Sequence, residues 1–82
     1  FSLDHMTFQP NMISNAGLHK TIEEKWYVLE GTGQIWIKNN SIEKVVDLYP
    51  GVAIQIDPGT ELQFRNNGEK PLKCLLICSP SW

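Results

Sequence analysis

Hydrophobic and polar residues alternate in several short segments of this chain. The clearest segments are 34–38, 52–56 and 61–65, and their alternating hydrophobic members are Ile35 and Ile37, then Val52, Ile54 and Ile56, then Leu62 and Phe64. A period of two residues is typical of a β-strand that buries one face and exposes the other. The pattern therefore predicts strands that turn these hydrophobic residues toward a common core.

Turn-forming residues separate these segments. Gly, Pro, Asn and Ser supply the backbone angles that tight turns need. The clusters are Gln9-Pro10-Asn11, Asn15-Ala16-Gly17, Gly31-Thr32-Gly33, Asn39-Asn40-Ser41, Tyr49-Pro50-Gly51, Asp57-Pro58-Gly59, Asn66-Asn67-Gly68 and Ser79-Pro80. Turn signals at intervals of about 8–12 residues are typical of a β-sandwich or barrel. We therefore predict an all-β fold.

The segment 21–31 can be interpreted in two ways. As a helix, it would begin with a capping box formed by Thr21 and Glu24 and would end at Gly31. As a strand, it contains the run Trp26-Tyr27-Val28, whose residue types favour β-structure, and it leads into a clear alternating strand through Gly31-Thr32-Gly33. A hairpin suits this arrangement, and we predict a strand.

This predicted strand is hydrophobic on both faces. Trp26 and Val28 share one face, and Tyr27 and Leu29 share the other. A sheet with one face in water should alternate more cleanly, so a second element should cover the face of Tyr27 and Leu29. The cover is either a second copy of the chain, in a homodimer, or the N-terminal strand of the same chain.

Length and charge limit the classes of function. A chain of 82 residues is long enough for one domain, which we place at 1–82. Seven basic residues against nine acidic ones give a net charge of −2, and no basic run exists that would displace counterions from nucleic acid. No hydrophobic stretch approaches the ~20 residues that span a bilayer. We expect neither a nucleic-acid nor a membrane partner, and a cytoplasmic location without a signal peptide.

The two cysteines lie four residues apart in one predicted strand. Cys74 and Cys78 would share a face and stand ~13 Å apart, at a rise of ~3.3 Å per residue. A disulfide needs Cα atoms within about 7 Å, so a bridge between them is excluded. We expect two buried, reduced thiols, which also agree with a cytoplasmic location.

Two groups of residues resemble the motifs of the cupin superfamily. His19, four residues, Glu24, six residues and Gly31 match the end of the motif G-x5-H-x-H-x(3,4)-E-x6-G. Gly51, with Gly59 and Asn66, matches the frame of the motif G-x5-P-x-G-x2-H-x3-N. The resemblance covers nearly the whole chain. It implies a small single-domain cupin, a double-stranded β-helix or jelly-roll barrel with antiparallel strands in two facing sheets.

The chain departs from these motifs where cupins bind metal. The resemblance implies a divalent ion held by three histidines and one glutamate, but Gly17 and Leu62 stand where two of the histidines are expected. Only His19 and Glu24 remain as metal ligands. A divalent ion usually needs at least three protein donors to stay bound against water. We therefore expect no tightly held cofactor, and a divalent metal held only weakly by His19 and Glu24.

Three hypotheses about function follow from the resemblance. The first is a protein that binds a small molecule in the barrel cavity, lined by Trp26, Val28, Leu62 and Phe64, with His19 and Glu24 as its polar points. The alternative is a metal-dependent enzyme of the dioxygenase or isomerase type, which uses His19 and Glu24 with ligands that the sequence does not place, such as His5, Glu61 or water. The third is a structural or regulatory dimer module. No catalytic residue is assigned.

Further residues carry simpler expectations. We expect His5 to be exposed on the first strand, and Glu61 to point away from Leu62 unless a bulge near Thr60 redirects it. Trp26 and Trp36 are expected to fill the core, although either could instead stack on a flat ligand. Gln55 and Gln63 are expected to face outward, and Asp57 to cap the turn before Pro58-Gly59.

Overall fold

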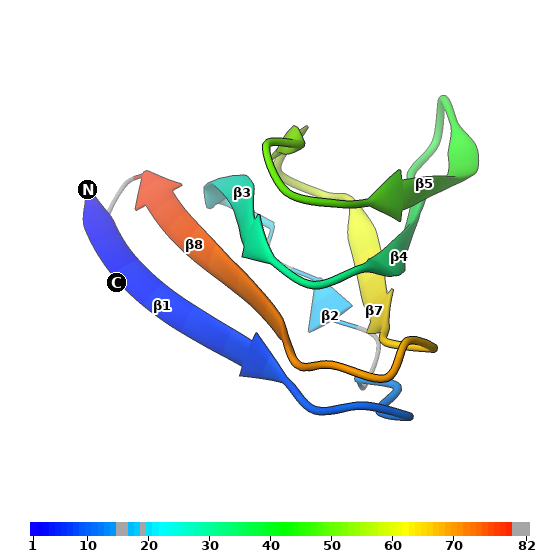
Figure 1. Ribbon diagram of the computed structural model, residues 1–82. Helices are drawn as coiled ribbons and strands as arrows, with labels where there is room; N and C mark the ends of the chain where they lie inside the picture. Colours follow the sequence, from blue (N-terminus) through cyan, green and yellow to red (C-terminus); the bar gives the residue numbers. More distant parts are fainter. Residues whose placement is uncertain (15–16, 19, 80–82) are drawn as a thin grey trace.

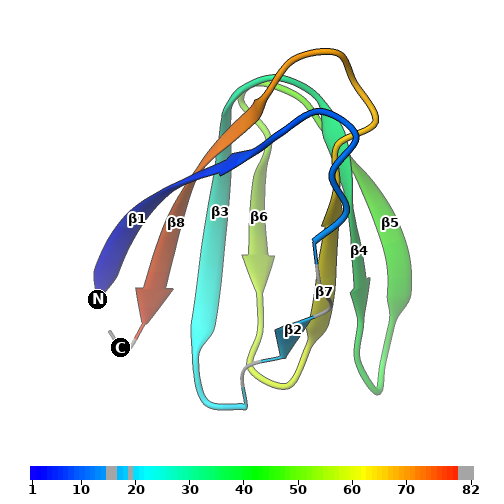
Figure 2. The ribbon, with the colours of Figure 1, turned by 90° about the horizontal axis from the view of Figure 1, so that it is seen from below.

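The chain folds into two antiparallel sheets that face one another (Figures 1 and 2). The computed structural model describes residues 1–14, 17–18 and 20–79, without the side chain of residue 18. The strands are β1 (Ser2–Phe8), β2 (Gly17–Leu18), β3 (Glu23–Glu30), β4 (Gly33–Lys38), β5 (Glu43–Leu48), β6 (Ala53–Ile56), β7 (Glu61–Arg65) and β8 (Leu72–Ser79). One sheet has the order β1-β8-β3-β6 and the other β2-β7-β4-β5. The predicted all-β jelly-roll is confirmed.

The segment that could be interpreted as a helix is strand β3. Its even-numbered residues Glu24, Trp26 and Val28 are buried, and it pairs with β6 on one side and β8 on the other. Two strand partners satisfy the backbone groups that a helix would have bonded internally.

The part of the chain that the structure describes contains no helix that could span a membrane.

The connection after β3 is not the hairpin that its glycines predicted. β3 and β4 belong to different sheets, so the chain crosses from one sheet to the other at this point. Gly31 makes the crossing with φ +85°, and an added Cβ would stand 2.3 Å from the carbonyl oxygen of Pro71. Glycine is needed here because both the left-handed backbone and the close approach exclude a side chain.

The core lies between the sheets and centres on three aromatic rings. Phe8, Trp26 and Phe64 come from β1, β3 and β7, and the ring centroid of Phe64 lies 4.5 Å from each of the other two. Around them pack aliphatic residues and the two cysteines, which are buried and free as predicted. Burial raises the pKa of the Cys74 thiol to about 11, so this thiol stays protonated at neutral pH.

Tyr27 and Leu29 are not covered by the N-terminal strand. β1 pairs edge to edge with β8 and so extends the sheet, leaving the side chain of Tyr27 44% exposed and that of Leu29 37% exposed. The interpretation in which the same chain covers this face is therefore wrong. The homodimer stays a prediction.

The side chain of Asn66 ties two separate parts of the chain together. Its side-chain nitrogen Nδ2 donates hydrogen bonds to the carbonyl oxygens of Phe8, at 2.9 Å, and Lys70, at 2.8 Å. Its oxygen Oδ1 accepts one from the backbone N–H of Gly68, at 3.0 Å. These bonds join the end of β1 to the loop after β7, so the asparagine of the second motif serves the fold.

We predict that the substitution Asn66→Ala lowers the free energy of unfolding by about 3 kcal/mol, because it leaves buried backbone groups without partners. Asn67→Ala, at the exposed neighbouring position, should change it by less than about 0.5 kcal/mol. Urea denaturation of the two variants and the parent measures both values. Equal values for the two variants would contradict the role assigned to Asn66.

Candidate functional site in the barrel interior

Glu24 is the one charged side chain among the buried residues that the structure describes. It is only 4% exposed, and its oxygen Oε1 accepts a hydrogen bond from the indole Nε1–H of Trp26 at 2.8 Å. A buried carboxylate costs free energy even when it is hydrogen-bonded, because its hydration is lost. Glu24 is therefore a costly residue for a small core and the first candidate for a functional group.

Two further polar groups lie in line with Glu24 across the sheet. Cys78 on β8 is paired with Glu24 on β3, and Ser2 on β1 is paired with Cys78. The hydroxyl Oγ of Ser2 is buried without a hydrogen-bond partner among the described residues. Ile56 on β6, also paired with Glu24, completes the row across the sheet.

We call Ser2, Cys78 and Glu24 the polar row. All three lie where β1 and β3 begin and β8 ends, at one end of the barrel, and β2 lies at the same end (Figure 2). A hydroxyl, a thiol and a carboxylate thus share one otherwise hydrophobic surface. The sequence placed Glu24 here, but it missed Ser2 and Cys78. Alternation predicts that Cys78 lies on the inner face. It does not predict the strand register, which sets Ser2 and Glu24 as the cross-strand partners of Cys78.

The hydrophobic residues predicted to line the cavity do gather in the interior. Trp26, Val28 and Phe64 are core residues, and Leu62 is half-buried and packs against them. The side chains of Trp26 and Phe64, with Phe8, fill the middle of the barrel. The ligand-binding role of these residues stays a prediction.

Two of the positions that would hold a metal in the resemblance have no side-chain donor. Gly17 on β2 and Leu62 on β7 are direct cross-strand partners, so two positions without side-chain donors form one side of the expected site. The described residues contain no group of three or more His, Cys, Asp and Glu side chains that could hold a metal. His19 lies outside the described residues. The metal role of His19 and Glu24 therefore stays a prediction.

The other ligands considered for a metal enzyme lie on the outside. His5 is exposed on β1, as predicted. The more buried residues of this strand, Ser2, Met6 and Phe8, lie on its opposite face. Glu61 is exposed as well, because strand parity turns it away from Leu62. Neither side chain reaches the interior with Glu24.

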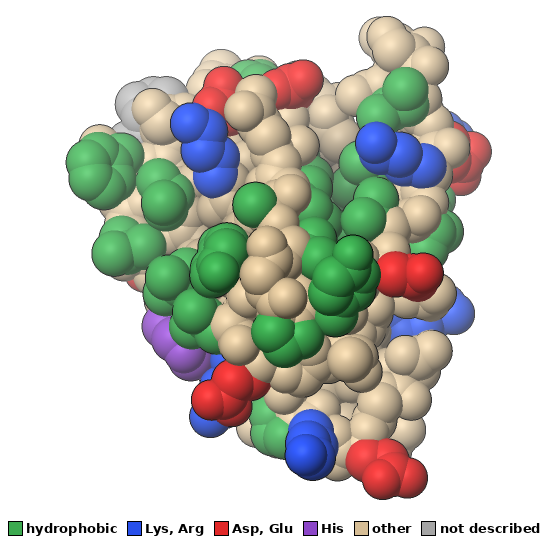
Figure 3. Space-filling model, turned by 45° about the horizontal axis from the view of Figure 1, so that its top comes forward, with side chains coloured by type: hydrophobic (Ala, Val, Ile, Leu, Met, Phe, Trp, Pro, Cys, Tyr) green, Lys and Arg blue, Asp and Glu red, His purple; other side chains and the backbone are tan. Residues whose placement is uncertain are grey.

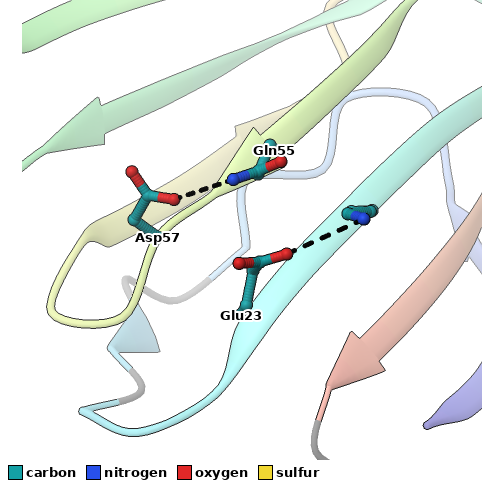
Figure 4. Close-up of polar contacts among 4 residues, drawn as sticks. Glu23, Gln55 and Asp57 are labelled. Carbon is teal, nitrogen blue, oxygen red and sulfur yellow. Dashed lines mark hydrogen bonds and ion pairs between the residues drawn. The ribbon is translucent and has the colours of Figure 1, made fainter.

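Polar residues on the outside of the β1-β8-β3-β6 sheet bind one another. Glu23 forms an ion pair with Lys25, with 3.8 Å between Oε1 and Nζ. Gln55 Nε2 donates a hydrogen bond to Asp57 Oδ1 at 3.0 Å (Figure 4). The prediction that the Asp57 side chain caps the turn at Pro58-Gly59 is wrong. The turn is closed by the backbone carbonyl oxygen of Asp57, which accepts a hydrogen bond from the N–H of Thr60. Gln55 faces outward, as predicted.

Trp36 is not in the core. It is half-buried on the outer face of β4, and its indole Nε1–H donates to Glu43 Oε2 at 3.0 Å. It lines a groove on the outside of the second sheet, together with Gln63 and other polar residues. The alternation of Trp36 with Ile35 and Ile37 carried this signal, because it placed the ring on the face opposite to the core.

A family model described as "Cupin domain" matches residues 4–78 of the chain. This chain belongs to the cupin family. Solved cupin structures confirm the fold: the cupin domain of CENP-C from Drosophila melanogaster, bound to CAL1, is 25% identical with a TM-score of 0.86. The alignment covers 94% of this cupin and 63% of that chain. A comparison with curated proteins gave no match.

Two bacterial proteins have the same architecture. A protein from Bacillus halodurans is 24% identical with a TM-score of 0.88, over 98% of this cupin and 62% of that chain. A predicted oxalate decarboxylase from Thermotoga maritima is 22% identical with a TM-score of 0.79, over 93% of this cupin and 63% of that chain. This cupin spans 57–63% of the length of the CENP-C chains it matches. At 22–24% identity, the bacterial structures establish the fold alone.

Proposed function

We propose that this cupin binds a small molecule at the polar-row end of its barrel, without a resident metal. The observation that carries the proposal is the polar row itself, in which the buried Glu24 carboxylate shares a hydrophobic surface with the Ser2 hydroxyl and the Cys78 thiol. A few converging polar groups in an apolar setting are typical of small-molecule sites. A ligand that bonds to them recovers part of the cost of burying them.

The chemistry of the row indicates the class of ligand. The Glu24 carboxylate accepts hydrogen bonds, and the Ser2 hydroxyl both donates and accepts them. Ile56, which is paired with Glu24, and Leu62, which packs against the core, supply aliphatic surface. The ligand should therefore carry an amine or a hydroxyl on an apolar body, and an anionic ligand should be rejected by Glu24. We also propose a cytoplasmic location, because the two free thiols would stay reduced there.

The metal-dependent enzyme is the less favoured hypothesis. The paired Gly17 and Leu62 offer no side-chain donor. Of the two expected metal ligands, His19 and Glu24, the structure describes only Glu24, and no group of three or more ligating side chains is found among the described residues. No catalytic step is therefore assigned to any residue. The similarity to a predicted oxalate decarboxylase does not extend beyond the fold at 22% identity.

Benzylamine and benzyl alcohol test the ligand site, with benzoate as the mismatched anion. We predict that the first two shift the NMR resonance of the Trp26 indole N–H, because this group donates directly to Glu24. Glu24→Gln should weaken benzylamine binding about tenfold or more, through loss of a charge-assisted hydrogen bond. Nuclear magnetic resonance titrations of the labelled protein give the dissociation constants.

The matched control is Glu23→Gln, one residue away on the outer face, which should bind benzylamine like the parent. Ser2→Ala provides a second variant, with weaker binding of both probes, in case Glu24→Gln does not fold. The proposal fails if neither probe shifts the Trp26 resonance at concentrations of about 10 mM. It also fails if Glu23→Gln and Glu24→Gln weaken benzylamine binding equally.

A second candidate function is self-association through the outer face of the β1-β8-β3-β6 sheet. Leu3 is 59% exposed there, Tyr27 is 44% exposed, and Ile77 lies between β1 and β3 in register with Leu3 and Lys25. Exposed hydrophobic side chains gather over part of the molecular surface (Figure 3). Large exposed hydrophobic patches are typical of protein interfaces. One structure of the similar CENP-C cupin domain has a protein partner, CAL1.

For this second function we predict a homodimer at low micromolar concentration, with twice the 9.3 kDa mass of the chain. Leu3→Glu should raise the dimer dissociation constant about tenfold or more, because it would bury a charge. Val45→Glu is the matched control: Val45 is 57% exposed but lies on the other sheet. Light scattering after size exclusion measures the masses. A monomeric parent, or equal effects of both variants, would contradict a dimer through this face.

A further inference from the structure

A groove of about 380 Å³ lies on the outside of the β2-β7-β4-β5 sheet, on the side away from the barrel interior. It is lined by Gln34, Trp36, Val45, Gln63 and Arg65. The register explains how residues from three strands meet here. Trp36 on β4 pairs with Val45 on β5 and with Gln63 on β7, and Gln34 pairs with Arg65. The volume is at the small end for ligand sites, which suits a single ring.

Two side chains of the groove are held in place by acidic residues of β5. The indole Nε1–H of Trp36 donates to Glu43 Oε2 at 3.0 Å, and Gln34 Nε2 donates to Asp47 Oδ1 at 3.1 Å. These bonds use the donor of the indole, so the ring offers a ligand only its apolar surface. They leave the amide oxygen of Gln34 as an acceptor. Both side chains are thus preorganised before a ligand arrives.

The other two polar side chains of the groove have no such partners. The ion pairs among the described residues join Lys25 to Glu23 and Lys73 to Glu30, and Arg65 takes part in neither. Gln63 makes no side-chain hydrogen bond within the described ranges. A guanidinium and an amide on β7 are therefore available to a ligand. The planar guanidinium fork matches a carboxylate with two parallel hydrogen bonds.

The charges across the groove give a bound anion one orientation. Glu43 and Asp47 are on β5, at one side of the groove, and Arg65 is on β7, at the other. Gln34 lies between Asp47 and Arg65 in the ladder. A carboxylate would be repelled from the β5 side and attracted to the β7 side.

We propose that this groove binds a hexuronate, a sugar ring that carries a carboxylate. The ring lies on Trp36, its carboxylate binds Arg65, and its hydroxyls bond to the amides of Gln34 and Gln63. A flat aromatic acid would satisfy Trp36 and Arg65 but would leave both amides without a ligand partner. The two amides therefore favour the sugar acid. The groove is separate from the polar row and does not depend on the function proposed for it.

The test uses D-glucuronate, with D-glucose as its neutral counterpart and benzoate as the aromatic acid. We predict that glucuronate shifts the NMR resonance of the Trp36 indole N–H with a dissociation constant of about 1 mM, and leaves that of Trp26 unchanged. Glucose and benzoate should each bind about tenfold more weakly or worse. Arg65→Gln should weaken glucuronate binding to the level of glucose, and Arg65→Lys should lie between the two.

Lys38→Gln is the matched control, because Lys38 is an exposed cation on the same strand as Trp36 but does not line the groove. This variant should bind glucuronate like the parent. The proposal is overturned if glucuronate leaves the Trp36 resonance unmoved at tens of millimolar, if glucose or benzoate binds as tightly as glucuronate, or if Lys38→Gln and Arg65→Gln weaken binding equally.

Discussion

The two sheets meet through the rings of Phe8, Trp26 and Phe64, which come from three strands far apart in the sequence. A chain of 82 residues has room for one small core, so a few large side chains must supply most of its buried surface. Removing one such ring would cost about 3–5 kcal/mol, a large share of the 5–15 kcal/mol that typically stabilises a domain. The same packing fixes the indole of Trp26, whose N–H reaches Glu24.

This arrangement divides the interior into two parts. The middle is closed by aromatic rings, whereas the end where β1 and β3 begin keeps a hydroxyl, a thiol and a carboxylate in one row. The strand pair β2–β7 faces this interior with Gly17 and Leu62, which cannot coordinate an ion through their side chains. Of the positions that the motif assigns to metal ligands, Glu24 carries an acidic group, whereas Gly17 and Leu62 have no side-chain donor. The small-molecule proposal rests on this combination.

The sequence predicted what depends on local pattern. Alternation identified β4, β6 and β7 and the inward faces of Ile35 and Phe64, and the motif spacing marked Glu24 and Asn66. Register and sheet assignment could not be predicted in this way, because they are set by contacts between distant segments. Ser2 was therefore not placed beside Cys78, and the turn at Gly31 was expected to form a hairpin rather than to cross between sheets.

We propose that Gly17 and Leu62 leave the metal position of the cupin motif without two of its side-chain donors, so that Glu24 holds no resident ion there. Elemental analysis of untagged protein by mass spectrometry tests it most directly. We predict far less than one equivalent of manganese, iron, nickel or zinc per chain, with no rise in melting temperature when these ions are added. Near-stoichiometric metal in the parent protein, lost on Glu24→Gln, would contradict the claim.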